Sequence, residues 1–412
     1  MTRVCVVRHG PFGSDPRVTK EAIALAGVPG VTVDVLARGS EPDAPHPATR
    51  VNVITISRTG PSERPVLLAV QALLFGLRTL GHVARARPRY DVVVIHSIPS
   101  WLLLLLWPAR VLRPGTRLLL DHHEPEAEML AEAGLPAAAA AAYRRVEALA
   151  IRTADGMVEV SDAMARRSAS MGARRQVVVD NSPALHIALA ERRREIRHDL
   201  AVFGSLIPRY DLLTLREALD TLGRPVSILQ SGRGAARLEG NPSGGPWRTF
   251  PHLEPALLQA ELRACAFGFV GLAPSAFTEL VSPNRLFELA SLGVPAVVAR
   301  TPLIEDLLGP HAVYYDGGSV KSLRRALRTA LDMDADARLA MGRGGQERVR
   351  DRTWERQSAR FVRFCLDPAG PTTTSVLRNV TPGLKRVPAD ADTPFEGDRL
   401  RSHVAVSPRE RG

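Results

Sequence analysis

The feature that most constrains the fold is the regular alternation of short apolar runs with helical patterns along the first half of the chain. The runs are rich in Val, Ile and Leu, as expected of buried strands, and the predicted strands cover residues 3–7, 32–37, 51–56, 91–96, 117–121, 156–160 and 176–179. This alternation predicts an α/β fold with a doubly wound parallel sheet. Ligands of such sheets bind beyond the carboxyl ends of the strands, so residues that follow a strand are the first functional candidates.

A second informative stretch, FTELVSPNRLFELASLGVPAVVA at 277–299, predicts a capped helix followed by a buried strand. Ser282 is suited to cap a helix that starts at Pro283, because a serine oxygen accepts from free amides and proline loses no bond there. Gly293 ends the predicted helix.

The polar face of this predicted helix suits a nucleotide-linked sugar. Asn284, Glu288 and Ser291 recur at i, i+4 and i+7 and therefore point the same way. Backbone amides at the helix N-terminus would bind phosphate oxygens, and Glu288 would accept from ribose hydroxyls. The alternative is that Glu288 only solvates a helix face.

The segment PNRLFELASLGVPAVVA resembles the donor-sugar segment of the retaining GT-B glycosyltransferases of family four. That family carries two glutamates seven residues apart here; the second matches Glu288, whereas the first falls at Leu280, so this chain departs from the pattern near the donor sugar. The resemblance implies a GT-B fold: two Rossmann-like, doubly wound parallel-sheet domains with an interdomain cleft. Ordered motifs extend over about residues 3–365.

The length of 412 residues exceeds a usual single core, in agreement with two domains. The resemblance implies an acceptor-binding domain at 1–185, completed by a C-terminal helix at about 352–366, then a linker at 186–198 and a nucleotide-sugar domain at 199–351. Residues 367–412 are rich in Pro, Thr, Arg and Asp without periodicity, which predicts a disordered tail.

Two loops of the first domain resemble the family's acceptor side. The loop after the first predicted strand, RHGPFGSDPRVTKEAIAL, matches the family's DPRVxKEAxAL opening, and a histidine ends the fourth strand. Asp15 is also suited to cap the helix at Pro16, and the terminal histidine is equally compatible with a satisfied strand end. The candidate acceptor-binding residues are His9, Gly10, Asp15, Arg17, Lys20 and His96.

The loop LLLDHHEPEAEM gathers histidines and carboxylates, which are typical metal ligands. Its spacing lacks the i, i+4 histidine pair of a zinc helix and the alternating oxygens of a calcium loop, so no metal is expected. The loop instead resembles the family's D-x-H-E segment, filled by Asp121, His122, His123 and Glu124. In the family the histidine lies over the donor sugar, and it maps onto His123.

The second domain opens with LAVFGSLIPRYDLL, where the family has a glycine and basic residues that contact the donor diphosphate. Gly204 and Arg209 match, whereas Ser205 stands where some members have an arginine and Tyr210 replaces a glycine. The run QSGRG resembles the family's strand ending in G-x-G, and 251–253 match the nucleobase loop. The candidate donor-binding residues are Gly204, Ser205, Gly232, Arg233, Ser282, Pro283, Asn284, Arg285 and Leu286.

The resemblance implies transfer of a sugar from a nucleotide-diphosphate sugar to a glycan, lipid-linked or small-molecule acceptor, with retention and without a metal or other cofactor. His123, Arg209 and Glu288 are the candidate catalytic residues. Two alternatives remain: an inverting enzyme that uses His9 as general base, and an inactive nucleotide-sugar-binding protein, given Leu280.

Composition bears on the partners and the compartment. A net charge of +11 attracts phosphates of any kind, but aromatic residues make up only 5% and do not interleave with a basic stripe, which argues against nucleic acid. Three scattered cysteines suit a reducing compartment, and the N-terminus lacks a signal-peptide pattern, so a cytoplasmic location is expected.

One segment, 64–89, has a helical pattern with many leucines and with arginines toward its end, including Arg78, Arg85, Arg87 and Arg89. It predicts peripheral contact with an anionic membrane, and the alternative is that its leucines form a buried helix face against the sheet. The most apolar run, 98–107, is too short to span a bilayer, and burial of its leucines against the sheet is the preferred interpretation. No transmembrane segment is expected.

Overall fold

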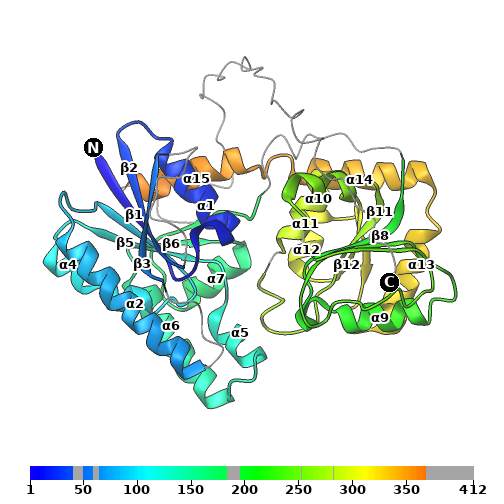
Figure 1. Ribbon diagram of the computed structural model, residues 1–412, viewed down its shortest axis with the longest axis horizontal. Helices are drawn as coiled ribbons and strands as arrows, with labels where there is room; N and C mark the ends of the chain where they lie inside the picture. Colours follow the sequence, from blue (N-terminus) through cyan, green and yellow to red (C-terminus); the bar gives the residue numbers. More distant parts are fainter. Residues whose placement is uncertain (40–49, 59–64, 183–194, 252, 282, 368–412) are drawn as a thin grey trace, which may run out of the picture. The chain divides into compact units, whose positions relative to one another are not determined.

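The computed structural model describes residues 1–39, 50–58, 65–182, 195–251, 253–281 and 283–367. Its first sheet is wholly parallel, in the order β3-β2-β1-β4-β5-β6-β7, as the alternation of the sequence predicts (Figure 1). The strands are β1 (Thr2–Arg8), β2 (Val31–Arg38), β3 (Val51–Ser57), β4 (Val92–His96), β5 (Arg117–His122), β6 (Gly156–Glu159) and β7 (Gln176–Val178). Each predicted strand is present, within two residues at either end.

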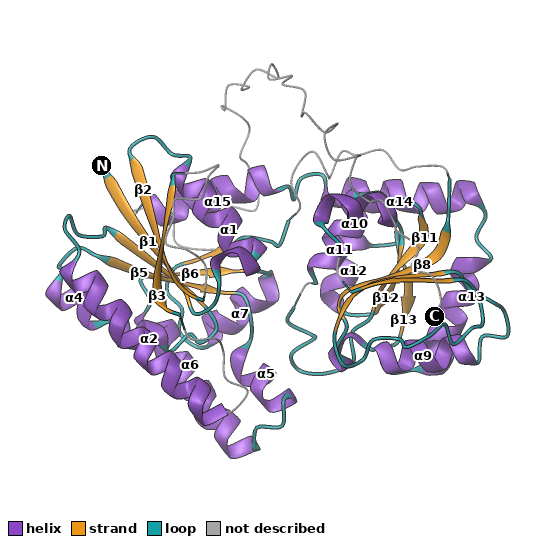
Figure 2. Ribbon diagram, viewed as in Figure 1, coloured by secondary structure: helices purple, strands orange, loops and turns teal. Residues whose placement is uncertain are grey.

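Helices cover both faces of this sheet (Figure 2) because successive side chains of each strand point to opposite sides. Val4 and Val6 of β1 join a core with α1, whereas Cys5 and Val7 join a second core with α2 and α3. The helices are α1 (Pro16–Ala26), α2 (Pro65–Arg85), α3 (Leu102–Leu106), α4 (Pro108–Leu112), α5 (Glu126–Glu132), α6 (Ala137–Thr153) and α7 (Asp162–Ser170).

The last described helix, α15 (Trp354–Leu366), returns to this first sheet. It packs against α1, β4 and β7, and its Phe361, Phe364 and Cys365 are buried in the core beside β1. Gly156 of β6 allows the close approach, because a Cβ there would lie 2.7 Å from the Phe364 ring.

The second sheet is also parallel, in the order β10-β9-β8-β11-β12-β13. Its strands are β8 (His198–Ser205), β9 (Ile228–Arg233), β10 (Trp247–Phe250), β11 (Cys265–Val270), β12 (Ala296–Ala299) and β13 (Val313–Tyr315). Its helices are α9 (Leu212–Asp220), α10 (Pro255–Leu262), α11 (Asn284–Ser291), α12 (Pro302–Leu308), α13 (Val320–Leu331) and α14 (Ala335–Val349). Two parallel α/β domains are therefore present.

The predicted helix of 277–299 needs two corrections. It begins at Asn284, since Pro283 has extended dihedrals and acts as the N-cap, and the predicted cap Ser282 lies outside the described residues. Ser291 is buried rather than on a solvated polar face, because α14 packs on α11 and Gln346 donates to the Ser291 carbonyl. Gly293 ends the helix with a left-handed φ of 66°, as predicted.

The apolar segments of the first domain differ in burial. Leu102, Leu103 and Leu106 of α3 are buried against the sheet, as preferred from the sequence. Among the described residues, one helix, Leu67–Arg85 within α2, is long and apolar enough to cross a membrane by length and composition alone. Its Phe75, Thr79 and Val83 are nevertheless buried in the protein.

Candidate active site

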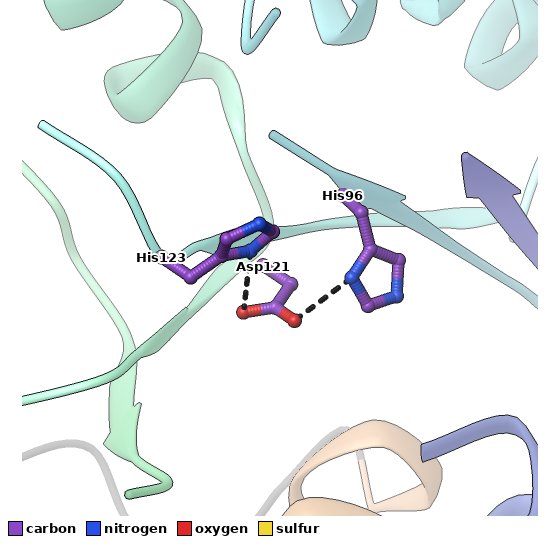
Figure 3. A group of neighbouring side chains, drawn as sticks. All are labelled: His96, Asp121 and His123. Carbon is purple, nitrogen blue, oxygen red and sulfur yellow. Dashed lines mark ion pairs between the residues drawn. The ribbon is translucent and has the colours of Figure 1, made fainter. Parts of the chain in front are cut away.

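The carboxyl ends of β4 and β5 and the first turns of α1 bring five ionisable side chains together. Asp121 is the centre of the group, with His96 and His123 turned toward it (Figure 3). Arg17 and Glu21 reach the same place from α1, one helical turn apart. Residues far apart in sequence therefore form one cluster, as expected where strands of a parallel sheet end.

Asp121 is held as a carboxylate by Arg17. The Arg17 guanidinium donates from Nε to Oδ2 at 2.9 Å and from Nη2 to Oδ1 at 3.1 Å, a bidentate pairing. Burial opposes ionisation of Asp121, but the charge of Arg17 outweighs it and holds the pKa of that carboxyl well below its usual range. Arg17 also donates from Nη1 to the carbonyl of Val179 and to Asn181. Arg17 thus ties α1 to the strand ends, and its contact with an acceptor stays a prediction.

His96 is completely buried between two carboxyl groups. Its Nδ1 lies 2.9 Å from Asp121 Oδ2, and its Nε2 lies 3.6 Å from Glu21 Oε2. Burial lowers the pKa of His96 despite Asp121, so the neutral imidazole is favoured. Burial and the charge of Asp121 raise the pKa of Glu21 well above its ordinary value, which favours its protonated form.

His123 is the member of the cluster that remains partly exposed, at 13% of its side chain. Its Nδ1 lies 3.9 Å from Asp121 Oδ1, and its backbone amide donates to Ser97 Oγ at 3.3 Å. Asp121 therefore restrains the orientation of the ring, while the exposed part of the ring is available to a ligand.

The ligand atoms of His96, Asp121 and His123 lie within 4.8 Å of one another, a spacing that a metal ion would accept. Both oxygens of Asp121 already accept from the Arg17 guanidinium, however, and a second cation there would be repelled by the first. The donor set of this cluster therefore fits a metal poorly.

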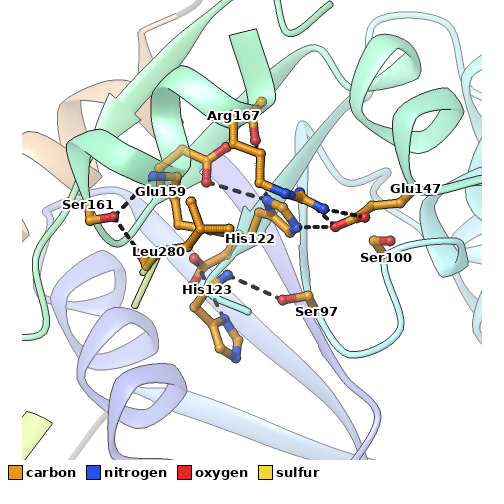
Figure 4. A network of polar contacts seen from close by, with 12 residues as sticks. Ser97, Ser100, His122, His123, Glu147, Glu159, Ser161, Arg167 and Leu280 are labelled. Atoms are coloured by element: carbon orange, nitrogen blue, oxygen red, sulfur yellow. Dashed lines mark hydrogen bonds and ion pairs between the residues drawn. The ribbon is translucent and has the colours of Figure 1, made fainter. Parts of the chain in front are cut away.

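The neighbouring His122 faces the other side of β5, because adjacent strand residues point to opposite faces. It lies 2.9 Å from Glu147 and 3.4 Å from Glu159, and Arg167 pairs with Glu147 at 2.8 Å (Figure 4). Burial opposes a positive charge, but Glu159 and Glu147 raise the pKa of His122 to about 10. His122 is thus a buried imidazolium that anchors the strand end carrying His123.

The loop after β1 places the remaining acceptor candidates. Asp15 caps α1 by accepting from the amides of Arg17 and Val18, and its side chain pairs with Arg8 at 3.1 Å. Lys20 donates to the Ser182 carbonyl at 2.9 Å. The Gly10 carbonyl accepts from the Arg38 amide at 3.1 Å.

His9 lies against Phe75, with ring centroids 5.1 Å apart, and its Nε2 is 3.0 Å from Arg38 Nη1. Burial, with the charges of Arg38 and Arg8, lowers the pKa of His9 to about 4. A base this weak accepts a proton poorly near neutral pH, which counts against the inverting alternative.

In the second domain, the ends of β8 and β9 approach so closely that glycine is required. Gly204 has φ 87° and Gly232 has φ 146°, and a Cβ on Gly232 would lie 1.9 Å from the Gly204 carbonyl oxygen. Such a bare backbone edge allows a ligand to approach the main chain. Ser205 ends β8 and Arg233 ends β9 with an exposed side chain.

Arg285, from the first turn of α11, covers this edge and is 7% exposed. Its guanidinium lies 3.8 Å over the Tyr210 ring and donates from Nη2 to the Ser205 carbonyl at 3.1 Å. Among the described residues, its buried Nη1 has no hydrogen-bond partner. A buried guanidinium nitrogen in this position is a hydrogen-bond donor without an acceptor, and a phosphate oxygen is an acceptor of the right kind.

Glu288 follows Arg285 on α11 and is partly buried. Burial raises its pKa to about 7, although Arg285 opposes that shift. Asn284 is exposed, whereas Pro283 and Leu286 are buried. Arg209 stacks over Phe277 at 3.9 Å. Ser282 and His252, the latter in the predicted nucleobase loop, lie outside the described residues.

Sequence reasoning did not assign site roles to Glu21, Asp121 or Tyr210. Glu21 is signalled by its i, i+4 spacing from Arg17, and Asp121 is signalled by its place in the D-x-H-E match. The stacking of Tyr210 under Arg285 has no local signal, because 75 residues separate the two in sequence.

Two family models match the chain. A Glycosyl transferase 4-like domain matches residues 13–182, and a Glycosyl transferase-like domain matches residues 226–363. A comparison with curated protein sequences gives no significant match.

Solved structures share the fold at low identity. The chain resembles a sucrose-phosphate synthase from Thermosynechococcus elongatus with a TM-score of 0.69 and 14% identity, over 87% of this chain and 97% of that one. A UDP-forming alpha,alpha-trehalose-phosphate synthase from Burkholderia xenovorans has a TM-score of 0.65 and 15% identity, over 90% of this chain and 100% of that one. A glycosyltransferase from Rickettsia africae has a TM-score of 0.58 and 10% identity, over 87% of this chain and 96% of that one.

Proposed function

The chain belongs to the GT-B glycosyltransferases of the family-four, group 1 type, and we propose that it transfers a sugar from a nucleotide-diphosphate sugar with retention of configuration. The observation that carries the donor assignment is the pairing of a glycine-lined strand edge, Gly204 and Gly232, with Arg285 Nη1, which has no hydrogen-bond partner within the described parts of the chain. Phosphate oxygens would accept from the guanidinium and from backbone amides at this edge.

Each candidate residue then has a physical role. Glu288 accepts from the ribose hydroxyls, and Arg209 and Arg285 stabilise the negative charge that develops on the departing diphosphate. His123, oriented by Asp121, lies over the donor sugar, as the family resemblance implies. Retention is supported by family membership, and burial, which lowers the pKa of His9 to about 4, makes His9 a weak base for an inverting route.

We also propose that transfer needs no metal or other cofactor. The one candidate cluster in the described residues, His96 with Asp121 and His123, already contains the Arg17 guanidinium as its cation. A cytoplasmic location is proposed because the three cysteines are free and buried, as suits a reducing compartment.

The acceptor is proposed to be a hydroxylated compound of the glycan, lipid-linked or small-molecule type. One structural relative, the Burkholderia xenovorans trehalose-phosphate synthase, has been solved in complex with glucose-6-phosphate, so sugar phosphates belong among the candidates.

The test is a panel of UDP-, GDP- and ADP-linked sugars, each assayed for protein stabilisation on heating and for release of the nucleoside diphosphate with sugar-phosphate, glycan and lipid-linked acceptors. One donor should stabilise the protein and be consumed in an acceptor-dependent reaction, with activity unchanged by EDTA. Binding without transfer to any acceptor would favour the inactive binding protein, and an inverted anomer in the product would refute retention.

A further inference from the structure

The long helix α2 has an apolar face that is about half exposed in the part of the chain that the structure describes. Val70, Leu73, Leu74 and Leu77 follow the i, i+3, i+4, i+7 spacing of one helix face, and each is 43–49% exposed. The opposite face carries Phe75, which packs in the core with α3 and the sheet. Four adjacent half-exposed apolar side chains on one helix differ from scattered single ones, because they form a continuous patch.

The short helix α4 packs beside α2 (Figure 1) and carries further exposed apolar side chains. Trp107, Val111 and Leu112 are 45%, 64% and 58% exposed. Arg113 fixes the two helices together, since its Nε donates to the Ala84 carbonyl at 2.7 Å. We call these apolar residues of α2 and α4 the α2–α4 surface.

The net charge of this region is strongly positive. Residues 65–120 contain seven arginines and a single acidic residue, Asp91, whose carboxylate accepts from the Arg3 amide. Arg78 and Arg85 are exposed on α2 itself, and Arg87 is exposed just beyond its end. A leucine-rich patch with arginines at its edge matches the boundary between acyl chains and anionic headgroups.

We propose that the α2–α4 surface docks the enzyme on an anionic lipid bilayer, with α2 lying in the plane of the interface. The leucines and Trp107 enter the headgroup boundary, and the arginines pair with lipid phosphates. A membrane-spanning α2 would require Phe75, Thr79 and Val83 to leave the core.

Co-sedimentation of the full chain with phosphatidylcholine vesicles, with and without phosphatidylglycerol, tests the apolar part. The double variant Leu73→Gln, Leu77→Gln should bind the anionic vesicles about tenfold more weakly. The matched control is Leu213→Gln, Leu257→Gln, which changes two leucines of similar exposure, 57% and 51%, in the other domain. Equal binding by the two double variants would overturn the proposal.

The charged part is tested with Arg78→Gln, Arg85→Gln and Arg87→Gln combined. This variant should bind anionic vesicles on the order of a hundredfold more weakly, and the wild-type binding should fall as salt rises. The control replaces the exposed Arg216, Arg325 and Arg343 of the second domain by glutamine, which should change binding little.

Three results would refute docking: no binding of the wild-type protein to anionic vesicles at low salt, equal losses in both arginine variants, or a dimer in solution that the Leu73→Gln, Leu77→Gln variant dissociates. Donor binding measured without vesicles should be the same in all these variants, so failure of docking leaves the proposed transferase activity standing.

Discussion

Replacing Arg285 by methionine separates a ligand-binding role from a structural one. The guanidinium is buried over Tyr210, donates once to the Ser205 carbonyl, and leaves Nη1 unpartnered among the described residues. Methionine has a similar length and packs well against a ring. It forfeits the cation–π contact and one hydrogen bond but also removes a buried, incompletely paired charge, so the free energy of unfolding should change by less than about 2 kcal/mol.

Affinity for the donor should change much more. A hydrogen bond from a charged group contributes about 1.5–3 kcal/mol, so the loss of one from Arg285 to a phosphate oxygen should weaken binding by about 10- to 150-fold. Isothermal titration with the matching nucleoside diphosphate measures this loss, and urea unfolding of the unliganded protein measures stability.

Arg175 supplies the matched control, because it is also buried and lies 3.9 Å over a ring, that of Phe364. Its Nη2 donates to the carbonyls of Phe364 and Asp367, so Arg175→Met should lose stability while nucleotide affinity stays unchanged. The reverse pattern, a destabilised Arg285→Met that binds nucleotide normally, would show that Arg285 only supports the fold.

Three further predictions concern ionisable residues. Burial raises the pKa of Glu288 to about 7, above its value in the unfolded chain, so ionisation of Glu288 lowers the free energy of unfolding as pH rises from about 4.5 past 7. In urea unfolding, Glu288→Gln should be as stable as wild type near pH 4 and more stable by about 1–3 kcal/mol at pH 8. Equal stability of the variant and the wild type at both pH values would contradict this prediction. His123→Ala should lower turnover by about a hundredfold or more with donor affinity nearly unchanged, whereas equal losses would mean that His123 only binds. His122→Gln removes the imidazolium between Glu147 and Glu159 and should lower the free energy of unfolding by about 3–5 kcal/mol at pH 7. This difference from wild type should shrink as pH rises through about 10, where wild type loses the same charge. A difference in stability that does not depend on pH would refute the assignment.

The sequence was sufficient to predict the strands of the first domain and, in the second domain, the strand that ends in QSGRG and the buried strand after the donor helix. Short β-branched runs between helical patterns sufficed for β1 to β7, because a strand buried on both faces must be apolar throughout. The exception is the start of β8 at His198, inside a charged segment, since backbone pairing with Cys265 rather than side-chain pattern defines that strand end. The donor segment could also be predicted from the local sequence, because the helix period places Asn284 and Glu288 on the same face.

The roles of the charged residues were decided by the tertiary structure. The sequence predicts Arg17 as an acceptor-binding residue at the start of a helix, yet in the structure it is bound to Asp121, 104 residues away. His122 and His123 are adjacent in sequence, but one is a buried cation in a glutamate pair and the other remains partly exposed beside Asp121.

The same holds for α2 and for Arg285. Leu74 and Phe75 are both apolar in one helical pattern, but only the sheet and α3 decide that Phe75 is buried and Leu74 exposed. The position of Arg285 depends on Tyr210, over whose ring it lies, and on the Ser205 carbonyl, to which it donates, and both residues are distant from it in sequence. Local periodicity encodes which segments become strands and helices; which polar groups meet depends on contacts between residues distant in sequence, and those exist only after the sheets have formed.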